Sequence, residues 1–352
     1  MIWLTWRQGR SQTLVVAGGA AALLAFLALA AGSMPDFTDD FIRVFAADQF
    51  LVTVYTIATM LVLCLPAIIG IFWGAPLVAR ELEAGTHRLV WNQSVTRTRW
   101  LATKLLVTGG AALLIVAVLS LALTWWAGSL DDAVNAGQNN PGMLGQPRIA
   151  SPMFDTRGLA PIGYTAFAFT LGVAAGTVVR RTVPAMAITL AVFVVVQILT
   201  PSLVREHLGP SSTLSTITAD NLVGLMIQGD PSVGPLGPVK EIQIEVDEPG
   251  AWVIANQTLD RTGKVQDELP SWFAGCVPGK AVEAGFGPPP GIPQGRSEAC
   301  FKRAAAEGYK QRVTFMPASK YWTLQATETA IFLALAGLLA AGTFWWLRVR
   351  IA

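Results

Sequence analysis

The chain has 352 residues, of which 53% are hydrophobic and 14% are charged. Soluble domains carry about a quarter of charged residues, so this composition favours a membrane protein over a soluble globular one. The net charge of +2 gives no basic field that would point to nucleic acid as a partner, and three cysteines with two histidines are too few and too scattered for a metal site.

Six uncharged apolar runs follow one another along the chain. A bilayer core is roughly 30 Å thick, so a spanning helix needs about 20 mostly apolar residues. Because the backbone in hydrocarbon must satisfy its own hydrogen bonds, each run should be helical. The runs are Ser11–Pro35, Leu51–Ala79, Leu105–Leu130, Gly158–Val179, Thr182–Val204 and Thr329–Leu347. We therefore expect an α-helical polytopic membrane protein with six transmembrane helices.

Residues 1–12 are predicted to form a cytoplasmic interfacial elbow helix. Trp3 and Trp6 precede the first run beside Arg7, a pattern in which indoles lie at headgroup level and cations face the cytoplasm. Simple anchoring of the chain is the alternative to an elbow that contacts a partner. We expect the first run to stay in the protein, although the small residues at its end would also suit signal-peptide cleavage.

Lys and Arg alternate between the connections and set the expected topology. They gather before the first run, in the segment 80–104, at Arg180-Arg181 and in the tail at Arg348, whereas the other short connections are acidic or mixed. Cytoplasmic loops carry the excess of Lys and Arg, so both termini are expected in the cytoplasm. An Arg at the bilayer centre costs roughly 2.5–3.5 kcal/mol, so Arg180 and Arg181 should form a turn between two helices.

This topology divides the chain into four parts. They are the elbow (1–12), transmembrane helices 1–5 with a cytoplasmic loop at 80–104 (13–203), an extracytoplasmic domain (204–326), and transmembrane helix 6 with a cytoplasmic tail (327–352). The long external segment carries Lys and Arg, but segments over about 60 residues escape the charge rule.

The external segment is predicted to be a small α+β domain. Glu241–Val246 alternates polar and apolar residues, as a strand does, and Trp252–Leu259 is a second candidate strand. Asp260–Gly263 has the residues of a turn, and Ser297–Gln311 has those of a helix with Ser297 as N-cap.

Cys276 and Cys300 both lie in this segment. An extracytoplasmic compartment permits a disulfide, and a bridge between them would stabilise the domain by roughly 3 kcal/mol in the chain-entropy model. Two free thiols are the alternative. Cys64 lies inside the second run and is expected to be a packing residue.

Catalytic motifs are missing from the sequence. There is no P-loop, no G-x-S-x-G, no H-E-x-x-H and no C-x-x-C, so we expect no enzyme activity and no cofactor in this chain. The runs hold no ionisable residue, which argues against a proton-driven antiporter. Arg205, Glu206 and His207 are expected to form a solvated cluster at the end of a span.

The connection after the second run carries a family resemblance. It reads Arg80-Glu81-Leu82-Glu83-Ala84-Gly85-Thr86-His87-Arg88-Leu89, and Arg97-Thr98-Arg99-Trp100-Leu101-Ala102-Thr103-Lys104 leads into the third run. With the six-run layout, it resembles the permease subunits of type-2 ATP-binding-cassette (ABC) exporters, in which this loop is a coupling helix inserted into a cleft of the ATPase subunit. Lys320–Glu328 and the two external cysteines resemble a subset common in actinobacteria. The enlarged domain between the last two runs departs from the short helical pair of much of the family.

The resemblance implies a site, partners and a function. Glu81, Glu83, Gly85, Thr86 and Arg88 would contact or shape the ATPase interface; a basic segment that merely sets topology is the alternative. The implied partners are a cytoplasmic P-loop ATPase with its ATP and magnesium, and a second permease as homodimer or sister chain, in the lipid of a bacterial plasma membrane. The implied function is export of an apolar or amphipathic substrate, such as a drug, a peptide antibiotic or a lipid. A non-transporting receptor or scaffold that signals through an ATPase is the other possibility.

Overall fold

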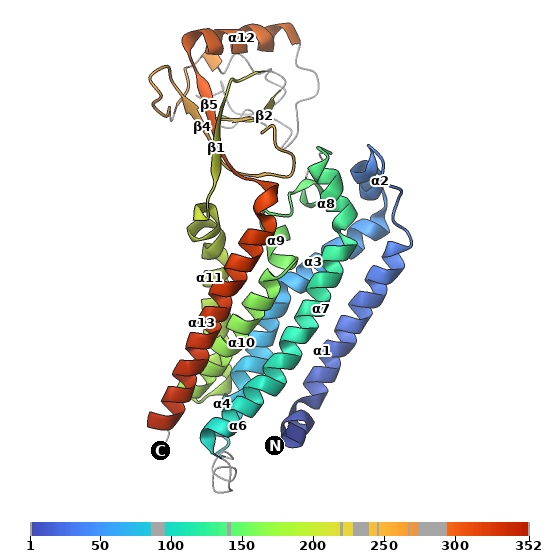
Figure 1. Ribbon diagram of the computed structural model, residues 1–352, viewed down its shortest axis with the longest axis vertical. Helices are drawn as coiled ribbons and strands as arrows, with labels where there is room; N and C mark the ends of the chain where they lie inside the picture. The colour runs from blue at the N-terminus through green and yellow to red at the C-terminus, as the bar shows by residue number, and fades with distance from the viewer. Residues whose placement is uncertain are drawn as a thin grey trace, which may run out of the picture. The chain divides into compact units, whose positions relative to one another are not determined.

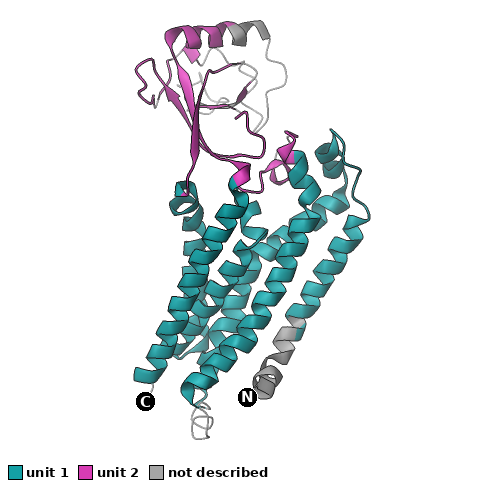
Figure 2. Cartoon of the chain, in the orientation of Figure 1, with its two compact units in different colours: residues 1–133, 150–207, 320–352 teal, residues 134–149, 208–319 magenta. Residues whose placement is uncertain are grey.

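The computed structural model describes residues 2–85, 96–138, 142–218, 221–227, 239–244, 246–266, 268–270, 272–273 and 294–350, with the backbone alone at 2–13, 15, 223–227, 240 and 294–298. The chain divides into two compact units (Figure 2). Unit 1 comprises Met1–Ala133, Ala150–His207 and Lys320–Ala352, and unit 2 comprises Val134–Ile149 and Leu208–Ser319. Unit 2 thus covers most of the segment predicted as an external domain, and it takes in a second insertion at Val134–Ile149.

Unit 1 is built from helices that run side by side (Figure 1). In chain order they are α1 (Ile2–Ala31), α2 (Phe41–Ala47), α3 (Gln49–Ile69), η1 (Gly70–Gly74), α4 (Ala75–Glu83), α6 (Arg97–Lys104), η2 (Leu105–Gly109), α7 (Gly110–Trp126), α9 (Met153–Thr156), α10 (Ala160–Val179), α11 (Thr182–Leu203), η4 (Arg205–His207) and α13 (Tyr321–Val349). Helix α8 (Gly128–Asn135) and the short η3 (Met143–Gly145) and η6 (Ala318–Lys320) lie on the connections to unit 2.

Five helical segments are long and apolar enough to cross a membrane. They are Gln49–Glu83, Arg97–Trp126, Ala160–Val179, Thr182–His207 and Ala318–Val349. This confirms a polytopic helical membrane protein and the helical nature of the last five runs. Helix α1 adds a shorter apolar stretch, Val16–Ala31, among the described residues, so a sixth span there stays a prediction. The elbow at 1–12 also stays a prediction, because the backbone is helical without a break from Ile2 to Ala31.

The predicted turn at Arg180-Arg181 is confirmed. Helix α10 ends at Val179 and α11 begins at Thr182, and Arg180 takes the left-handed conformation with φ 58°. A left-handed residue at the end of a helix reverses the chain and lets its amide bond back to the helix, as the Arg180 amide does to the Gly176 carbonyl.

Helix α10 is the centre of unit 1 and packs against α13, α4, η1, α11, α3 and α7. Small residues bring its backbone into contact with its neighbours. A Cβ at Gly172 would lie 2.4 Å from the Gly70 carbonyl oxygen, and one at Gly176 would lie 2.4 Å from the Ala75 carbonyl oxygen. Gly-x-x-x-Gly spacing on both faces, at Gly172 with Gly176 and at Gly70 with Gly74, is the pattern that lets membrane helices approach closely.

Two single π-helical turns, η1 and η2, interrupt the spans on either side of the predicted coupling loop. Both turns abut Phe169 of α10, since a Cβ at Gly74 would lie 2.5 Å from its carbonyl oxygen and one at Gly109 would lie 2.9 Å from its ring. Trp73 and Trp100 pack in the same buried cluster as Phe169. Irregular turns of this kind often lie at functional sites, and these two flank one loop.

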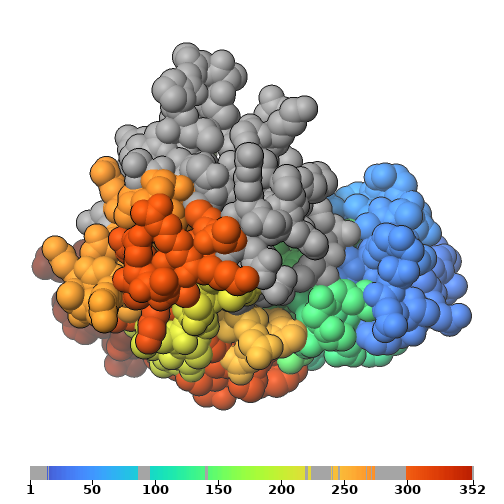
Figure 3. Space-filling view, turned by 90° about the horizontal axis from the view of Figure 1, so that it is seen from above, coloured from blue at the N-terminus to red at the C-terminus, as the bar shows by residue number. Residues whose placement is uncertain are grey.

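The connection between α1 and α3 carries apolar side chains on its surface. Phe41 and Phe45 of α2 are buried, and Phe45 meets the rings of Tyr55 and Trp126 edge-on. Phe37 and Val44 on the same connection are about half exposed. This connection belongs to the part of the chain that is drawn blue in Figure 3. An amphipathic segment of this composition suits a membrane–water interface.

Unit 2 contains two antiparallel sheets. Strands β1 (Ser211–Ser215), β5 (Lys310–Met316) and β4 (Trp252–Leu259) form one in that order, and β2 (Leu222–Ile227) pairs with β3 (Val239–Ile244) in the other. The register places Ser211 opposite Phe315 and Trp252 opposite Met316. Helix α12 (Gln294–Glu307) contributes Phe301 and Ala304 to a buried core with Ile242, Phe273 and Val313.

The α+β character of this segment was predicted, and so were β3 and the bounds of β4. The turn after β4 is confirmed, since Asp260 Oδ1 accepts hydrogen bonds from the amides of Thr262 (2.8 Å) and Lys264 (3.0 Å). The hydrogen bond from the Thr262 hydroxyl, with those from these two amides, holds the pKa of the Asp260 carboxyl below its ordinary value. The predicted helix Ser297–Gln311 is wrong at both ends. It begins at Gln294, so Ser297 lies inside the helix and is not its N-cap. It ends at Glu307, because Gly308 (φ 86°) stops the helix and Lys310–Met316 forms β5.

Candidate functional site

The two glutamates predicted to face an ATPase have partners within the chain. Lys104 at the end of α6 donates to Glu81 of α4 at 2.5 Å and to the Leu77 carbonyl at 3.1 Å, and its ammonium lies 4.7 Å from the centre of the Trp100 ring. The side chains of Lys104 and Glu81 are 6% and 16% exposed. This pair therefore joins the two helices that enter and leave the predicted coupling loop.

Glu83 joins the same helix to the fifth run. Its Oε2 accepts from the backbone amide of Thr182 at 3.0 Å and from the Thr182 hydroxyl at 2.8 Å. Thr182 is the first residue of α11, so the carboxylate satisfies an amide that has no partner inside its own helix and lies at the positive end of the helix dipole. Glu81 and Glu83 together hold the end of α4 against α6 and α11.

The remaining predicted loop residues are only partly described. Gly85 follows α4 with φ 69°, a conformation that favours glycine, and confirms that the helix breaks there. Thr86 and Arg88 lie outside the described residues. Direct contact of these five residues with an ATPase stays a prediction.

Among the predicted anchor residues, Arg180 donates to the carbonyl of Arg350 at 3.4 Å and so joins the α10–α11 turn to the end of α13. Arg181 and Arg348 are exposed. The side chains of Trp3, Trp6 and Arg7 lie outside the described ones, and so does Cys276. The Cys276–Cys300 disulfide therefore stays a prediction. Cys64 was expected to be a packing residue, but its side chain is exposed, and its thiol is free.

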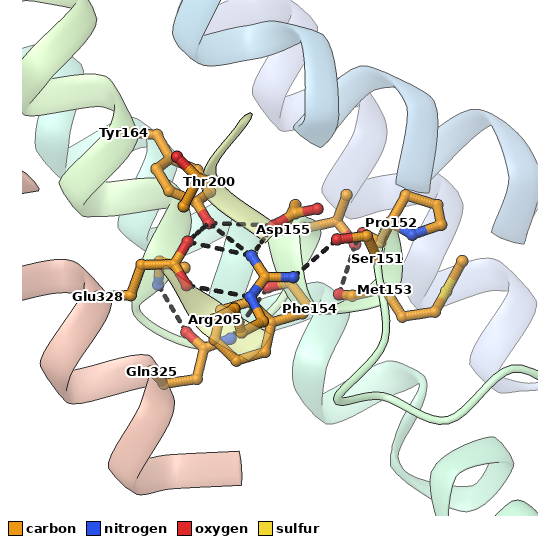
Figure 4. Close-up of polar contacts among 12 residues, drawn as sticks. Ser151, Pro152, Met153, Phe154, Asp155, Tyr164, Thr200, Arg205, Gln325 and Glu328 are labelled. Carbon is orange, nitrogen blue, oxygen red and sulfur yellow. Dashed lines mark hydrogen bonds and ion pairs between the residues drawn. The ribbon is translucent and has the colours of Figure 1, made fainter. Parts of the chain in front are cut away.

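The largest polar cluster among the described residues surrounds Arg205, at the ends of the spans away from the loop between α4 and α6 (Figures 1 and 4). We call Ser151, Asp155, Tyr164, Arg205 and Glu328 the Arg205 cluster. The Arg205 side chain is fully buried, as is that of Glu328, and Asp155 is 6% exposed. The expectation of a solvated cluster at Arg205–His207 is therefore wrong for Arg205, although His207 is exposed.

The guanidinium of Arg205 uses every nitrogen. Nε and Nη2 bind the two oxygens of Glu328 at 3.1 and 3.0 Å, a fork-to-fork arrangement that fixes both groups in one plane. Nη2 also donates to Asp155 at 2.5 Å, and Nη1 donates to the Ser151 hydroxyl at 2.7 Å. The guanidinium lies 3.9 Å from the centre of the Phe154 ring, so an aromatic face covers it.

Tyr164 completes the Arg205 cluster from α10. Its hydroxyl donates to Glu328 and lies 3.0 Å from Asp155, and it accepts from Arg205 Nη2 at 3.2 Å. The Arg205 guanidinium and the Tyr164 hydroxyl thus both bind the carboxyl groups of Asp155 and Glu328. Burial without such partners would cost each charge several kcal/mol, so the four groups depend on one another.

A second buried ion pair involves Arg157, which lies two residues after Asp155 on the same stretch of chain. Arg157 binds Asp131 of α8 through Nη1 and donates to the Tyr55 hydroxyl through Nη2 at 2.7 Å. Gln325 of α13 then ties this stretch to the last span, because its Oε1 accepts from the amides of Leu159 (2.9 Å) and Ala160 (2.7 Å) and its Nε2 donates to the Phe154 carbonyl (3.0 Å).

The sequence holds one signal that could have revealed these groups. Lys104, Asp131, Arg157, Arg205 and Glu328 each lie directly beside an apolar run, at the position where the run is broken by a charge. All five are buried. Lys104, Arg205 and Glu328 lie within the candidate spanning segments, so the argument against ion coupling that rested on uncharged runs no longer holds.

The sequence of these helices matches a known family of membrane proteins. The family described as ABC-2 membrane transporter related matches residues 3–205, which includes the helices of unit 1 up to Arg205 and the loop between α4 and α6. The chain belongs to this ABC-2 family. No curated protein and no solved structure matches the chain.

An ABC-2 protein is a membrane permease component of an ABC transporter, and permeases of this family typically work with a cytoplasmic ATPase subunit. The matched range ends at Arg205, so the family covers the first five runs and the Arg205 side of the buried cluster. Unit 2 between Leu208 and Ser319 and the last span, which carries Glu328, lie beyond it.

Proposed function

We propose that this ABC-2 permease exports an apolar or amphipathic substrate, such as a drug, a peptide antibiotic or a lipid, across a bacterial plasma membrane. ATP is hydrolysed in a separate cytoplasmic subunit, which brings its own magnesium. The observation that carries the proposal is the family match over residues 3–205, which contains the loop between α4 and α6. A chain without a P-loop needs such a subunit to supply energy.

The proposed topology has six spans, with α1 as the first, both termini in the cytoplasm and unit 2 outside. Its support is the alternation of basic and acidic connections and the basic turn at Arg180-Arg181. The transport pathway is proposed to lie between two permeases, as a homodimer or with a sister chain, and the resemblance of Lys320–Glu328 groups the chain with permeases common in actinobacteria. Arg180, Arg181 and Arg348 would contact the lipid headgroups of the inner leaflet.

The Glu81–Lys104 and Glu83–Thr182 contacts suggest how the loop would act. A force applied to the loop reaches α6 through one carboxylate and α11 through the other, because both lie on the last turn of α4. We expect Thr86 and Arg88 to make the direct contact with the ATPase, while Glu81 and Glu83 hold the loop in place.

The test is co-expression of the chain with a candidate P-loop ATPase from a neighbouring reading frame, followed by purification. We expect ATP hydrolysis in the complex and none by the chain alone, and we expect inverted vesicles that hold the complex to accumulate ethidium, an amphipathic cation, or a fluorescent lipid when ATP is added. Hydrolysis by the isolated chain would overturn the proposal. Hydrolysis in the complex without accumulation of any such probe would favour the receptor or scaffold function.

A further inference from the structure

The chain passes between unit 1 and unit 2 at four places. It leaves unit 1 after Ala133 and after His207, and it returns at Ala150 and at Lys320. The two segments of unit 2, Val134–Ile149 and Leu208–Ser319, are each connected to unit 1 at both ends. We call the stretches of chain at these four crossings the stems. Any change of state that passes along the chain between the spans and unit 2 must go through these stems.

Every stem has a buried charged anchor in unit 1. Asp131 precedes the first passage, Asp155 follows the second, Arg205 precedes the third, and Glu328 follows the fourth. These anchors lie on α8, α9, η4 and α13, which are far apart in the sequence. Figure 4 shows three of them, Asp155, Arg205 and Glu328, side by side.

Arg205 joins three of these stems directly. It binds Glu328 on the α13 stem, and Ser151 with Asp155 on the stem that returns at Ala150, while it is itself part of the α11 stem. The stem at Asp131 is joined to the same stretch through Arg157. Water does not screen these charges, because Arg205, Arg157 and Glu328 are at most 1% exposed, so their attraction stays strong.

We propose that Arg205 is a positioning residue that ties the stems of unit 2 to the span ends of α10, α11 and α13, so that a movement of these spans is passed to unit 2. Tyr164 brings α10 into this arrangement, and Gln325 gives α13 a second hold on the start of α10. The coupling part of this inference rests on the proposed transport cycle. The tying of the stems can be tested on the chain alone.

The first experiment measures hydrogen exchange by mass spectrometry on the full chain in lipid nanodiscs. In Arg205→Gln we expect about tenfold faster exchange in residues 151–160 and 321–328, which are distant in sequence from the substitution. Residues 172–179 of α10 and strand β5 should keep their protection. Faster exchange confined to residues 203–207 would overturn the inference, because Arg205 would then support its own turn alone.

Two further variants make the result specific. Arg303→Gln removes an exposed ion pair to Glu307 in unit 2 and should leave exchange in these segments unchanged. Arg205→Lys keeps the cation without the fork and should give an intermediate rate. If Arg205→Gln does not fold, Glu328→Gln keeps the shape and leaves Asp155 on Arg205, and it should loosen residues 321–328 more than residues 151–155; equal protection in the variant and the parent would contradict the inference.

The second experiment separates coupling from local packing. In the complex with the ATPase, we expect added ATP to change exchange in the unit 2 strands that follow and precede the stems, β1 and β5. In Arg205→Gln that change should be lost while ATP hydrolysis continues. An unchanged ATP response in the variant would overturn the coupling role. Absence of any ATPase complex would count against the proposed function alone, since the exchange data on the isolated chain would stand.

Discussion

At the residue scale, unit 1 buries several charged side chains and gives each of them a partner of opposite charge. Lys104 illustrates the arrangement, because its ammonium meets a carboxylate, a backbone carbonyl and an indole face at once. Removing one member of a buried pair leaves the other charge without compensation, whereas removing both can be nearly neutral. This asymmetry gives a direct test of whether the pair beside the predicted coupling loop is held as described.

Lys104→Met should destabilise the chain by about 3 kcal/mol, because Glu81, whose side chain is only 16% exposed, is left without its cation. The double variant Lys104→Met with Glu81→Gln should recover a large part of this loss. Thermal unfolding of the full chain in detergent, arranged as a double-mutant cycle, measures both effects. Arg43→Gln, which removes the exposed Arg43–Asp40 pair, is the control and should change stability far less. Additive effects of the two substitutions would show that the pair contributes nothing as a pair.

At the element scale, the contact of α10 with η1 and α4 depends on missing side chains. The Gly172 position faces backbone atoms of one neighbouring helical segment, the Gly70 carbonyl oxygen at 2.4 Å and the Ala75 nitrogen at 2.6 Å from an added Cβ. Backbone atoms cannot turn away as a flexible side chain can, so a methyl group there must separate the helices. The η1 turn lies on this contact, next to the span end that leads to the predicted coupling loop.

Gly172→Ala should therefore cost about 1–3 kcal/mol, the usual effect of overpacking a tight contact. Gly337→Ala is the matched control, because it lies in the middle of α13 with nothing within 4 Å of the added Cβ. This control should be neutral or slightly stabilising, since alanine is a better helix former than glycine. Unfolding of the two variants in the same detergent compares them. Equal stability would mean that α10 and η1 do not touch as described.

At the scale of the whole molecule, the charge distribution predicts that unit 2 lies outside the cell and that the loop after α4 lies in the cytoplasm. Ala84 beside the loop and Thr262 in the turn after β4 are both exposed, so cysteines introduced there report on each side. In a Cys64→Ser background, we expect an impermeant maleimide added to intact cells to label Thr262→Cys and not Ala84→Cys. Inverted vesicles should show the reverse. Labelling of both positions from one side would refute the topology.

The thiol chemistry of unit 2 depends on the same topology. If unit 2 is extracytoplasmic, Cys276 and Cys300 should form a disulfide, and a peptide map without reductant should show them linked. Cys300→Ser should lower the stability of unit 2 by roughly 3 kcal/mol, because the bridge closes a loop of about 25 residues and so restricts the unfolded chain. Alkylation of both thiols in unreduced protein would contradict the bridge.

Much of the fold was accessible from the sequence because it depends on local properties. An uncharged run of about 20 apolar residues is helical in a bilayer whatever it packs against, and five of the six runs are confirmed as candidate spans. The strand at Trp252–Leu259 and the turn at Asp260 also depend on neighbours in the sequence. The helix predicted through Gln311 failed where Gly308 takes a left-handed conformation and the following residues find strand partners in β1 and β4.

Hydropathy and charge by themselves thus determined that this protein is helical, crosses a membrane repeatedly, and carries an inserted α+β unit. Only the tertiary structure decided what the charges at the ends of the runs do. Arg205 can be buried because the fold brings it into contact with Asp155 and Glu328, which lie 50 and 123 positions away in the sequence. A charged residue beside an apolar run is solvated or buried according to whether a distant segment supplies its counter-charge, and that information lies in packing rather than in the local sequence.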